Sequence, residues 1–198
     1  MPAFLKIAVQ GGITASHDSG VYIGTWGSSL DEDTVGYGHT ELDIYAGYKT
    51  AIGDTVTVDV GAIFYLYPDA GPGEFDVYEF YAKAGFGLGP ATATLGVAYA
   101  PSEDSLDFGG PRDNLYLSAD LGAGIPDTPV SLSAHLGYTD GALTYTADSN
   151  ALDWSVGATL ALNSNLSVGA SYIGAGGLGN ATYDFVDDAA VFTLTAAF

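Results

Sequence analysis

The chain has 198 residues, of which 24 are Asp or Glu and only 4 are Lys or Arg, giving a formal net charge of −20 at pH 7. Disorder is excluded nonetheless, because 47% of the residues are hydrophobic and 13% are aromatic, which is ample for burial. So negative a chain is repelled by phosphate, and we therefore expect neither nucleic acid nor an anionic membrane leaflet as a partner. The absence of Cys excludes a disulfide scaffold, a thiolate nucleophile and Cys-ligated zinc.

Membrane-spanning helices are excluded by the hydropathy pattern. Gly, Asp, Ser or Thr interrupts every apolar run before it reaches the roughly 18 residues that such a helix needs. Residues 1–6 have neither the basic region nor the long apolar core of a signal peptide. We therefore expect either a cytoplasmic protein or a chain that begins after processing or truncation.

Apolar and polar residues alternate with a period of two along almost the whole chain, and no segment of helical length has a period of 3.6. This pattern predicts an all-β protein. The Gly-rich stretch 174–179 is expected to be a flexible loop. We expect eleven strands, at residues 5–16, 20–30, 39–51, 55–67, 76–88, 92–100, 113–124, 130–139, 151–162, 165–173 and 190–198.

The connections between these strands alternate strictly between short and long. Tight turns at one rim and long acidic loops at the other are typical of an up-and-down barrel of the bacterial outer membrane, whereas a Greek-key sandwich mixes both kinds at each end. Most strands have 9–13 residues, close to the roughly 9–11 that cross a bilayer at a tilt. The pattern therefore favours a barrel.

Aromatic residues gather toward the strand ends, as the interfacial girdles of a membrane barrel require. A soluble sandwich also holds many Tyr residues, so this distribution is supporting evidence only. The residues concerned are Tyr22, Trp26, Tyr45, Tyr48, Tyr65, Tyr67, Tyr78, Tyr99, Tyr138, Trp154 and Tyr172.

The final strand carries a candidate assembly signal. Phe192, Leu194 and Phe198 share one face of this strand, and the chain ends on the aromatic residue. A terminal Phe on an amphipathic strand resembles the signal that the outer-membrane assembly machinery reads, so that machinery is an expected partner. The alternative is an edge strand that ends on Phe by accident.

The expected number of strands, eleven, is odd, which is unusual for a bacterial outer-membrane barrel. Single-chain bacterial barrels have an even number of strands and both ends in the periplasm. With Phe198 in the periplasm, tracing the strands backward places Met1 outside the cell. We therefore expect one domain over residues 1–198, an up-and-down antiparallel transmembrane β-barrel with 11 strands in this chain and a parent count of 12, unless the barrel closes without the additional strand.

Seven blocks of the sequence carry a resemblance to a known family: Val9–Ile13, Ser16–Gly20, Tyr22–Ser28, Glu41–Tyr48, Tyr65–Pro68, Ser133–Tyr138 and Asp153–Gly157. Together they resemble the TorF-type porins of bacteria, over about residues 8–198. The resemblance implies an outer-membrane barrel and a pore, without a known substrate. Members typically begin with an additional strand carrying a Tyr-Arg-Phe-Arg-Gly-type segment, which this sequence lacks, in agreement with the parity argument.

Charged residues within the strands are expected to face the lumen, because a Lys or Arg facing lipid at mid-membrane costs about 2–4 kcal/mol. An excess of acids over lysines makes this lumen acidic, and rings of Asp and Glu select cations. The alternative is a plugged lumen, in which Lys6, Lys49 and Lys83 pair with neighbouring carboxylates. The predicted pore-lining residues are Glu41, Asp43, Lys49, Asp59, Glu79, Lys83, Asp120, His135 and Asp153.

No catalytic residue, cofactor or metal site is predicted. His17, Asp18 and Ser19 are neighbours in a tight turn and cannot form a triad relay. His135 near Asp120 fits a structural histidine better than an acid–base pair. The acidic loop runs at 31–33, 103–107 and 187–188 lack the spacing of a calcium loop, so we expect solvated loop tips, with Ca²⁺ binding as the alternative.

The sequence thus predicts a non-enzymatic barrel of the bacterial outer membrane, in contact with membrane lipid, that acts as a small diffusion channel for cationic solutes. A non-conducting structural or surface-interaction barrel is the first alternative. A soluble acidic β-protein, whose carboxylates serve solubility, is the second.

Overall fold

The computed structural model describes residues 8–73, 75–144, 146, 148–177 and 188–197. In these residues eleven strands form one antiparallel sheet, in which each strand pairs with its neighbours in chain order. The predicted all-β, up-and-down architecture is confirmed, and each predicted strand corresponds to an observed one. The strands are β1 Gln10–Ser16, β2 Val21–Ser29, β3 Thr40–Ile52, β4 Val56–Leu66, β5 Val77–Leu88, β6 Ala91–Ala100, β7 Asn114–Gly124, β8 Val130–Gly141, β9 Asn150–Ala161, β10 Leu166–Gly177 and β11 Ala189–Ala196.

Where the structure describes the chain, helical structure is confined to short turns between strands. These described turns are one turn of α-helix, α1 Glu32–Val35, and two 3₁₀ turns, η1 Asp104–Leu106 and η2 Ala142–Thr144. Within the described part of the chain, no helix has the length and apolar character needed to cross a bilayer.

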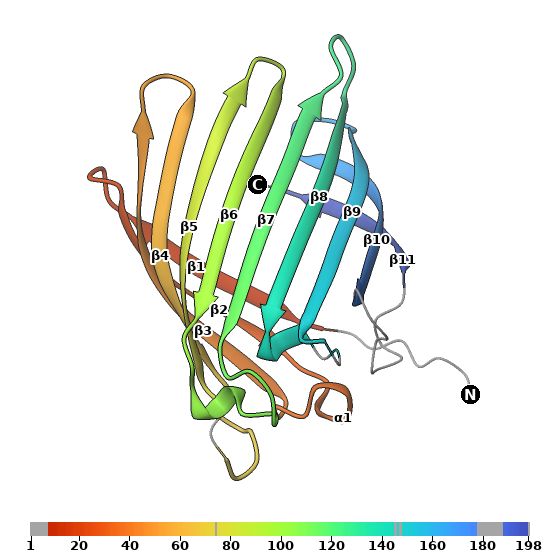
Figure 1. Cartoon of the computed structure of the whole chain (residues 1–198). Helices are drawn as coiled ribbons and strands as arrows, with labels where there is room; N and C mark the ends of the chain where they lie inside the picture. Colours follow the sequence, from red (N-terminus) through yellow and green to blue (C-terminus); the bar gives the residue numbers. More distant parts are fainter. Residues whose placement is uncertain (1–7, 74, 145, 147, 178–187, 198) are drawn as a thin grey trace.

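The sheet curls, so that β1 to β3 pass behind β5 to β9 (Figure 1). β1 and β11 lie at the two ends of the strand order, and no pairing between them occurs among the described residues. Closure by a twelfth strand stays a prediction.

The two rims differ as the sequence predicts (Figure 1). The turns at 17–20, 53–55, 89–90, 125–129 and 162–165 are short, and the connections at 30–39, 67–76 and 101–113 are long. One tight turn is closed by Nδ1 of His17, which lies 2.9 Å from the hydroxyl oxygen of Ser19. Strictly alternating connections bring all tight turns to one end of the sheet.

Strand β10 is longer than predicted. Its last residues pair with β9, where Gly174 lies opposite Trp154 and Gly177 opposite Ala151. The prediction of a loop from residue 174 onward was therefore wrong as far as Gly177. The ladder hydrogen bonds come from backbone groups, which glycine supplies as well as any residue, so composition alone gave a misleading strand end.

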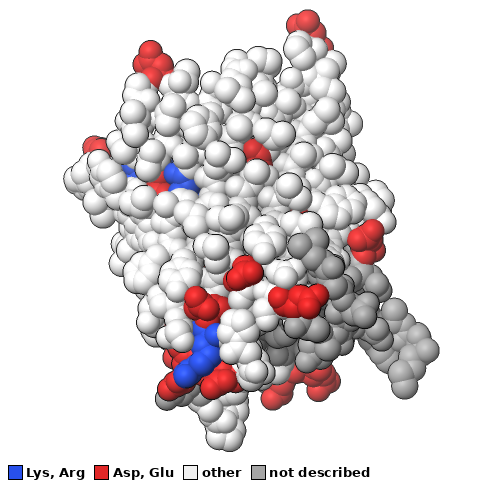
Figure 2. Space-filling model, in the orientation of Figure 1, with Lys and Arg blue, Asp and Glu red and all other residues white. Residues whose placement is uncertain are grey.

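The two faces of the sheet differ in polarity. Directly paired residues of antiparallel strands share a face, and the outward face carries large exposed apolar side chains such as Ile13 (73% exposed), Leu95 (54%) and Phe192 (82%). In Figure 2, charged residues gather at the tips of the turns and around the long loops, and the surface between them is largely uncharged. An apolar band of this kind fits contact with hydrocarbon.

Some of the aromatic residues predicted for the girdles face inward instead. Tyr22, Tyr45 and Tyr65 line the cavity enclosed by the sheet, and Trp26 shares the inward face of its direct partner Asp43. Position near a strand end does not specify the face, which depends on the register. The girdle prediction was therefore wrong for these four residues.

On the inner face, tyrosine rings lie over glycines of neighbouring strands. A Cβ added to Gly24 would overlap the ring of Tyr45, and one added to Gly61 would overlap the hydroxyl end of Tyr81. The glycines make room for the rings, and the rings cover backbone that would otherwise be bare. This packing fixes the tyrosines along the inner wall.

We expect Gly61→Ala to destabilise the protein. The new methyl group would meet Tyr81 and would lie 2.6 Å from the backbone oxygen of Ala46, which cannot move freely. Overpacking of this kind costs about 1–3 kcal/mol, and the urea midpoint of the detergent-folded protein measures it. Gly124→Ala is the matched control, because no atom lies within 4 Å of its added Cβ. Equal midpoints for the two variants would contradict this account of the packing.

Candidate functional site

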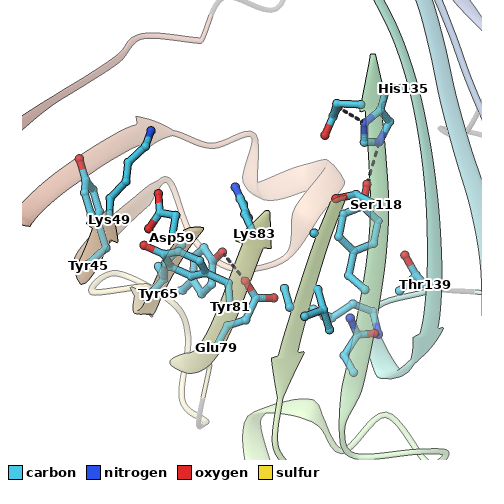
Figure 3. Close-up of a pocket in the computed structure, with 18 of the residues that line it drawn as sticks. Tyr45, Lys49, Asp59, Tyr65, Glu79, Tyr81, Lys83, Ser118, His135 and Thr139 are labelled. Carbon is cyan, nitrogen blue, oxygen red and sulfur yellow. Dashed lines mark hydrogen bonds and ion pairs between the residues drawn. The ribbon is translucent and has the colours of Figure 1, made fainter. Parts of the chain in front are cut away.

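The curled sheet surrounds an open cavity of about 850 Å³, with charged and hydroxyl groups in its wall (Figure 3). This volume lies in the range of about 300–1,000 Å³ that small-molecule sites occupy. Residues from β1 to β8 and from η2 contribute to its wall. The lining includes Thr14, Tyr22, Tyr45, Lys49, Asp59, Tyr65, Glu79, Tyr81, Lys83, Asn114, Tyr116, Ser118, Asp120, His135, Thr139 and Leu143.

Six of the nine predicted pore-lining residues lie in this wall: Lys49, Asp59, Glu79, Lys83, Asp120 and His135. The other three, Glu41, Asp43 and Asp153, lie on the same inward face. Asp153 contacts His135, and Asp43 is only 9% exposed. The structure thus brings the strand charges to one face.

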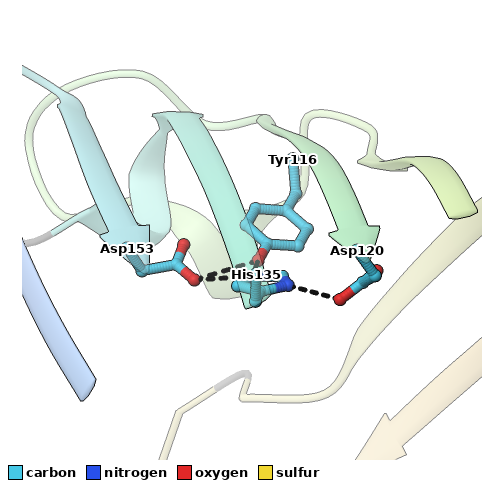
Figure 4. A network of polar contacts seen from close by, with 4 residues as sticks. All are labelled: Tyr116, Asp120, His135 and Asp153. Atoms are coloured by element: carbon cyan, nitrogen blue, oxygen red, sulfur yellow. Dashed lines mark hydrogen bonds and ion pairs between the residues drawn. The ribbon is translucent and has the colours of Figure 1, made fainter. Parts of the chain in front are cut away.

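His135 of β8 lies between two carboxylates (Figure 4). Its Nδ1 is 2.6 Å from Oδ1 of Asp120 on β7, and its Nε2 is 2.9 Å from Oδ1 of Asp153 on β9. The hydroxyl of Tyr116 lies 2.9 Å from the same Nε2 and donates to the same Asp153 oxygen at 3.2 Å. A neutral imidazole has a single N–H, so only the imidazolium can donate to both carboxylates. The geometry therefore fits a group of two carboxylates and one cation, with net charge −1.

Tyrosine hydroxyls bind three of the remaining carboxylates. Tyr22 donates to Asp59 at 2.5 Å, and its hydroxyl also contacts that of Tyr81. Tyr65 donates to Glu79 at 3.4 Å. Tyr67 donates likewise to Glu41, at 2.7 Å. No role at the site was predicted for these tyrosines, although the alternation that places the acids inward also places Tyr22, Tyr65 and Tyr81 there.

The two described lysines of the wall are exposed to the cavity. Among the described residues, neither Lys49 nor Lys83 has a carboxylate oxygen within 4.0 Å. The Nζ of Lys83 lies 5.6 Å from the ring centroid of Tyr81, within cation–π range. Lys6 lies outside the described residues. The plug of Lys–carboxylate pairs considered above is thus not formed by Lys49 or Lys83.

The connection 101–113 packs against residues that line the cavity. Its Leu106, in η1, is fully buried and packs with Val77 and Ala100. Tyr65 of β4 and Leu143 of η2 pack against the same cluster and also line the cavity. These apolar contacts join the connection to the end of the cavity on the side of the long loops, which we call its mouth.

Arg112 links several residues within the connection 101–113. Its guanidinium forms an ion pair with Asp104, and its Nε lies 3.7 Å from Oδ2 of Asp107. Its Nε also donates to the carbonyl of Glu103 at 3.4 Å, while the Glu103 N–H donates to the Arg112 carbonyl at 3.0 Å. Partial burial raises the pKa of the Glu103 carboxyl, and the hydrogen bond it accepts from the N–H of Tyr78 opposes that shift. One cation thus joins three acidic residues of the loop.

The acidic runs do not form a metal site in the part of the chain that is described. Within it, no three His, Cys, Asp or Glu side chains are placed to hold a metal ion. Asp104 and Asp107 contact Arg112 instead, and Asp188 accepts a hydrogen bond from the hydroxyl of Tyr172 at 3.3 Å. Asp187 lies outside the described residues.

Two of the three residues of the predicted assembly signal belong to the described part of the chain. Phe192 and Leu194 of β11 are 82% and 70% exposed and share the outward face. Phe198 lies outside the described residues. An exposed apolar face on the last strand is available for contact, and its role as a signal stays a prediction.

The fold and the cavity together define a class of protein. An up-and-down sheet that curls around a charged cavity and carries an apolar outer face is the architecture of porin-like β-barrels. The chain belongs to a bacterial family of proteins of unknown function, Gcw_chp, whose model matches residues 3–198. Comparison with curated protein sequences gave no match.

Solved structures of similar fold are outer-membrane porins. NanC porin is similar with a TM-score of 0.69 and 9% identity, over 96% of this chain and 93% of NanC. KdgM porin, in complex with disordered oligogalacturonate, is similar with a TM-score of 0.62 and 10% identity, over 96% of this chain and 92% of KdgM. OpdK of Pseudomonas aeruginosa, solved with vanillate, has a TM-score of 0.55 and 15% identity, over 96% of this chain and 56% of OpdK. At these identities the similarity shows the fold.

A double-mutant cycle on His135 and Asp120 tests the charge cluster. Replacing His135 by Ala and Asp120 by Asn, singly and together, is expected to show a coupling of about 0.5–3 kcal/mol in the free energy of unfolding, because the two side chains are in direct contact. Urea titration of the detergent-folded variants measures it.

The matched control is the exposed pair His39–Glu32, whose Nε2 and Oε2 atoms are 2.9 Å apart, against 2.6 Å for His135–Asp120. The side chains of the control pair are 69% and 54% exposed. Its coupling should stay below about 1 kcal/mol, as is usual for solvated ion pairs. A coupling for His135–Asp120 no larger than that of the control would show that the cluster is a solvated contact.

Proposed function

We propose that this chain is a porin of the bacterial outer membrane, of the TorF type, and that it acts as a small diffusion channel. The observation that carries the proposal is the cavity of about 850 Å³, lined by charged and hydroxyl groups and enclosed by a sheet whose outer face is apolar. Apolar side chains outside and polar ones inside suit a wall between lipid and water. The similarity in fold to NanC and KdgM porins supports the same function.

The proposed channel prefers cations or small cationic solutes. Its predicted wall holds six carboxylates, from Glu41, Asp43, Asp59, Glu79, Asp120 and Asp153, against the two lysines Lys49 and Lys83. Acidic walls attract cations and repel anions. The acidic residues of the long loops would add to this attraction at the mouth.

The proposed surroundings follow from the outer wall. Exposed side chains such as Leu95 and Phe192 would contact the hydrocarbon of the outer membrane. The last strand, with Phe192 and Leu194 outward, would be read by the outer-membrane assembly machinery during insertion. Neither role involves catalysis.

A second candidate is a barrel that does not conduct and acts through its surface loops. The observation that favours it is the packing of Leu106 with Val77 and Ala100, which fills part of the mouth. A solute would then enter only if the connection 101–113 moved.

Planar-bilayer recording tests the channel directly. We expect stepwise conductance from the folded barrel, and a reversal potential of the sign that cation preference produces in a KCl gradient. Asp120→Asn should reduce the preference, because it removes an exposed lumen charge, whereas Asp54→Asn, the same change in a tight turn, should not. Complete absence of channel events would refute conduction. A preference for anions would refute the proposal that the acidic wall selects cations.

The mouth loop gives a further prediction. Arg112→Gln removes the cation that joins Asp104 and Asp107, so the connection 101–113 should open more often. The pairs are exposed, so we expect a local loss of about 0.5–1 kcal/mol. This corresponds to roughly 2- to 5-fold more open loop, which chymotrypsin cleavage after the exposed Phe108 measures. In bilayers the mean conductance should rise.

Asp33→Asn, a charge change in the connection that carries α1, serves as the control and should alter neither measurement. Faster cleavage with unchanged conductance would show that the loop moves without gating the path. In that event the mouth is already wide enough for ions.

A further inference from the structure

A row of three charges crosses β3, β4 and β5 on one side of the cavity. Lys49 is directly paired with Asp59, and Asp59 is directly paired with Lys83. All three line the cavity, where Figure 3 shows them on one side and His135 on the other. The row contains two ammonium groups and one carboxylate, so its net charge is +1.

The ammonium groups are the available charges of this row. Asp59 is partly buried and accepts a hydrogen bond from Tyr22 at 2.5 Å. Lys49 and Lys83 are exposed, and among the described residues no carboxylate oxygen lies within 4.0 Å of either. Two unneutralised ammonium groups facing a cavity suit an oxyanion such as a carboxylate.

The cluster of Asp120, His135 and Asp153 has the opposite character. With an imidazolium between two carboxylates, its net charge is −1. Asp120 is its most accessible member, with its side chain 50% exposed against 25% for His135. The free oxygen of Asp120 can therefore accept a hydrogen bond from a solute cation.

The strand register fixes the distance between the two groups. Lys83 is paired with Gly96, and Thr94, two residues earlier on β6, is paired with Asp120. Lys83 on β5 and Asp120 on β7 are therefore two strands apart and offset by two residues along the strand direction. With the usual strand spacing and rise per residue, their Cα atoms lie about 12 Å apart. Both side chains face the cavity, so their charged ends can approach each other more closely than the Cα atoms. An extended dipeptide spans about 7 Å and a tripeptide about 10 Å.

We infer that the cavity binds extended zwitterions of the size of a di- or tripeptide, with the carboxylate at Lys49 and Lys83 and the ammonium at Asp120. The inference rests on the proposed channel, whose solute path this cavity would be. It also gives the lysines a role that a purely cation-selective wall does not. A single amino acid is too short to reach both groups.

Triglycine is the probe, and its capped forms are the controls. Added to the channel in planar bilayers, triglycine should block the KCl current with an apparent Kd at least fivefold below those of glycine, N-acetyltriglycine and triglycinamide. N-acetyltriglycine lacks the cation and triglycinamide lacks the anion, so each tests one half of the site. Equilibrium dialysis of labelled triglycine against the detergent-folded protein measures binding without conduction.

Substitutions test the two halves of the proposed site separately. Lys49→Met combined with Lys83→Met should raise the Kd of triglycine at least fivefold and leave that of triglycinamide unchanged. Asp120→Asn should raise the Kd of triglycine and leave the Kd of N-acetyltriglycine unchanged. Asp54→Asn, in the tight turn, should change neither Kd.

The possible failures are distinguishable. Equal affinity for triglycine and both capped forms in a conducting channel would overturn the zwitterion site and leave the channel standing. Triglycine binding in dialysis without any channel events would overturn the channel and leave the site. Loss of both signals in a correctly folded protein would overturn both.

Discussion

The rest of the structure depends on the strict alternation of side chains along strands held in one continuous register. Directly paired residues share a face, so every strand must turn its apolar set the same way. A slip of one residue in β4 would carry Asp59 to the outer face and bring Val60 inward, against Lys83 on β5. The apolar outer wall and the polar cavity are therefore two results of a single constraint, and neither can be changed without the other.

The inner face then has to satisfy many carboxylates in a confined space. Tyrosine does this well, because its long ring packs over a glycine on the next strand while its hydroxyl reaches a carboxylate on another, as Tyr22 does with Asp59. The imidazolium of His135 serves Asp120 and Asp153 in the same way. Because these donors are not lysines, Lys49 and Lys83 stay exposed. A count of acids thus overstates the negative charge that a solute would meet.

The strands, the two rims and the inward set of charges could be predicted, because each depends on local alternation or on turn residues. The partners of these charges could not. Asp153 is directly paired with Gly137 and reaches His135 diagonally, which requires the register as well as side-chain direction. Trp26 was assigned to a girdle from its position along the strand, although its face is set by pairing with Asp43. The packing of Leu106 with Val77 and Ala100 depends on long-range apolar contacts that no local pattern contains.

The distribution of basic residues bears on what the cavity does. The chain has four, against 24 acids, and solubility would be served by placing them anywhere on the rims. Every Lys and Arg within the described residues instead lies along the cavity or at its mouth: Lys49 and Lys83 in the wall, and Arg112 in the connection that narrows the entrance. The fold does not require two unpaired ammonium groups on the inner face, since hydroxyl groups already satisfy the neighbouring acids. Lys49 and Lys83 form no ion pair within 4.0 Å among the described residues, although Lys83 lies within cation–π range of Tyr81. Both ammonium groups face the cavity, where a solute that enters can meet them.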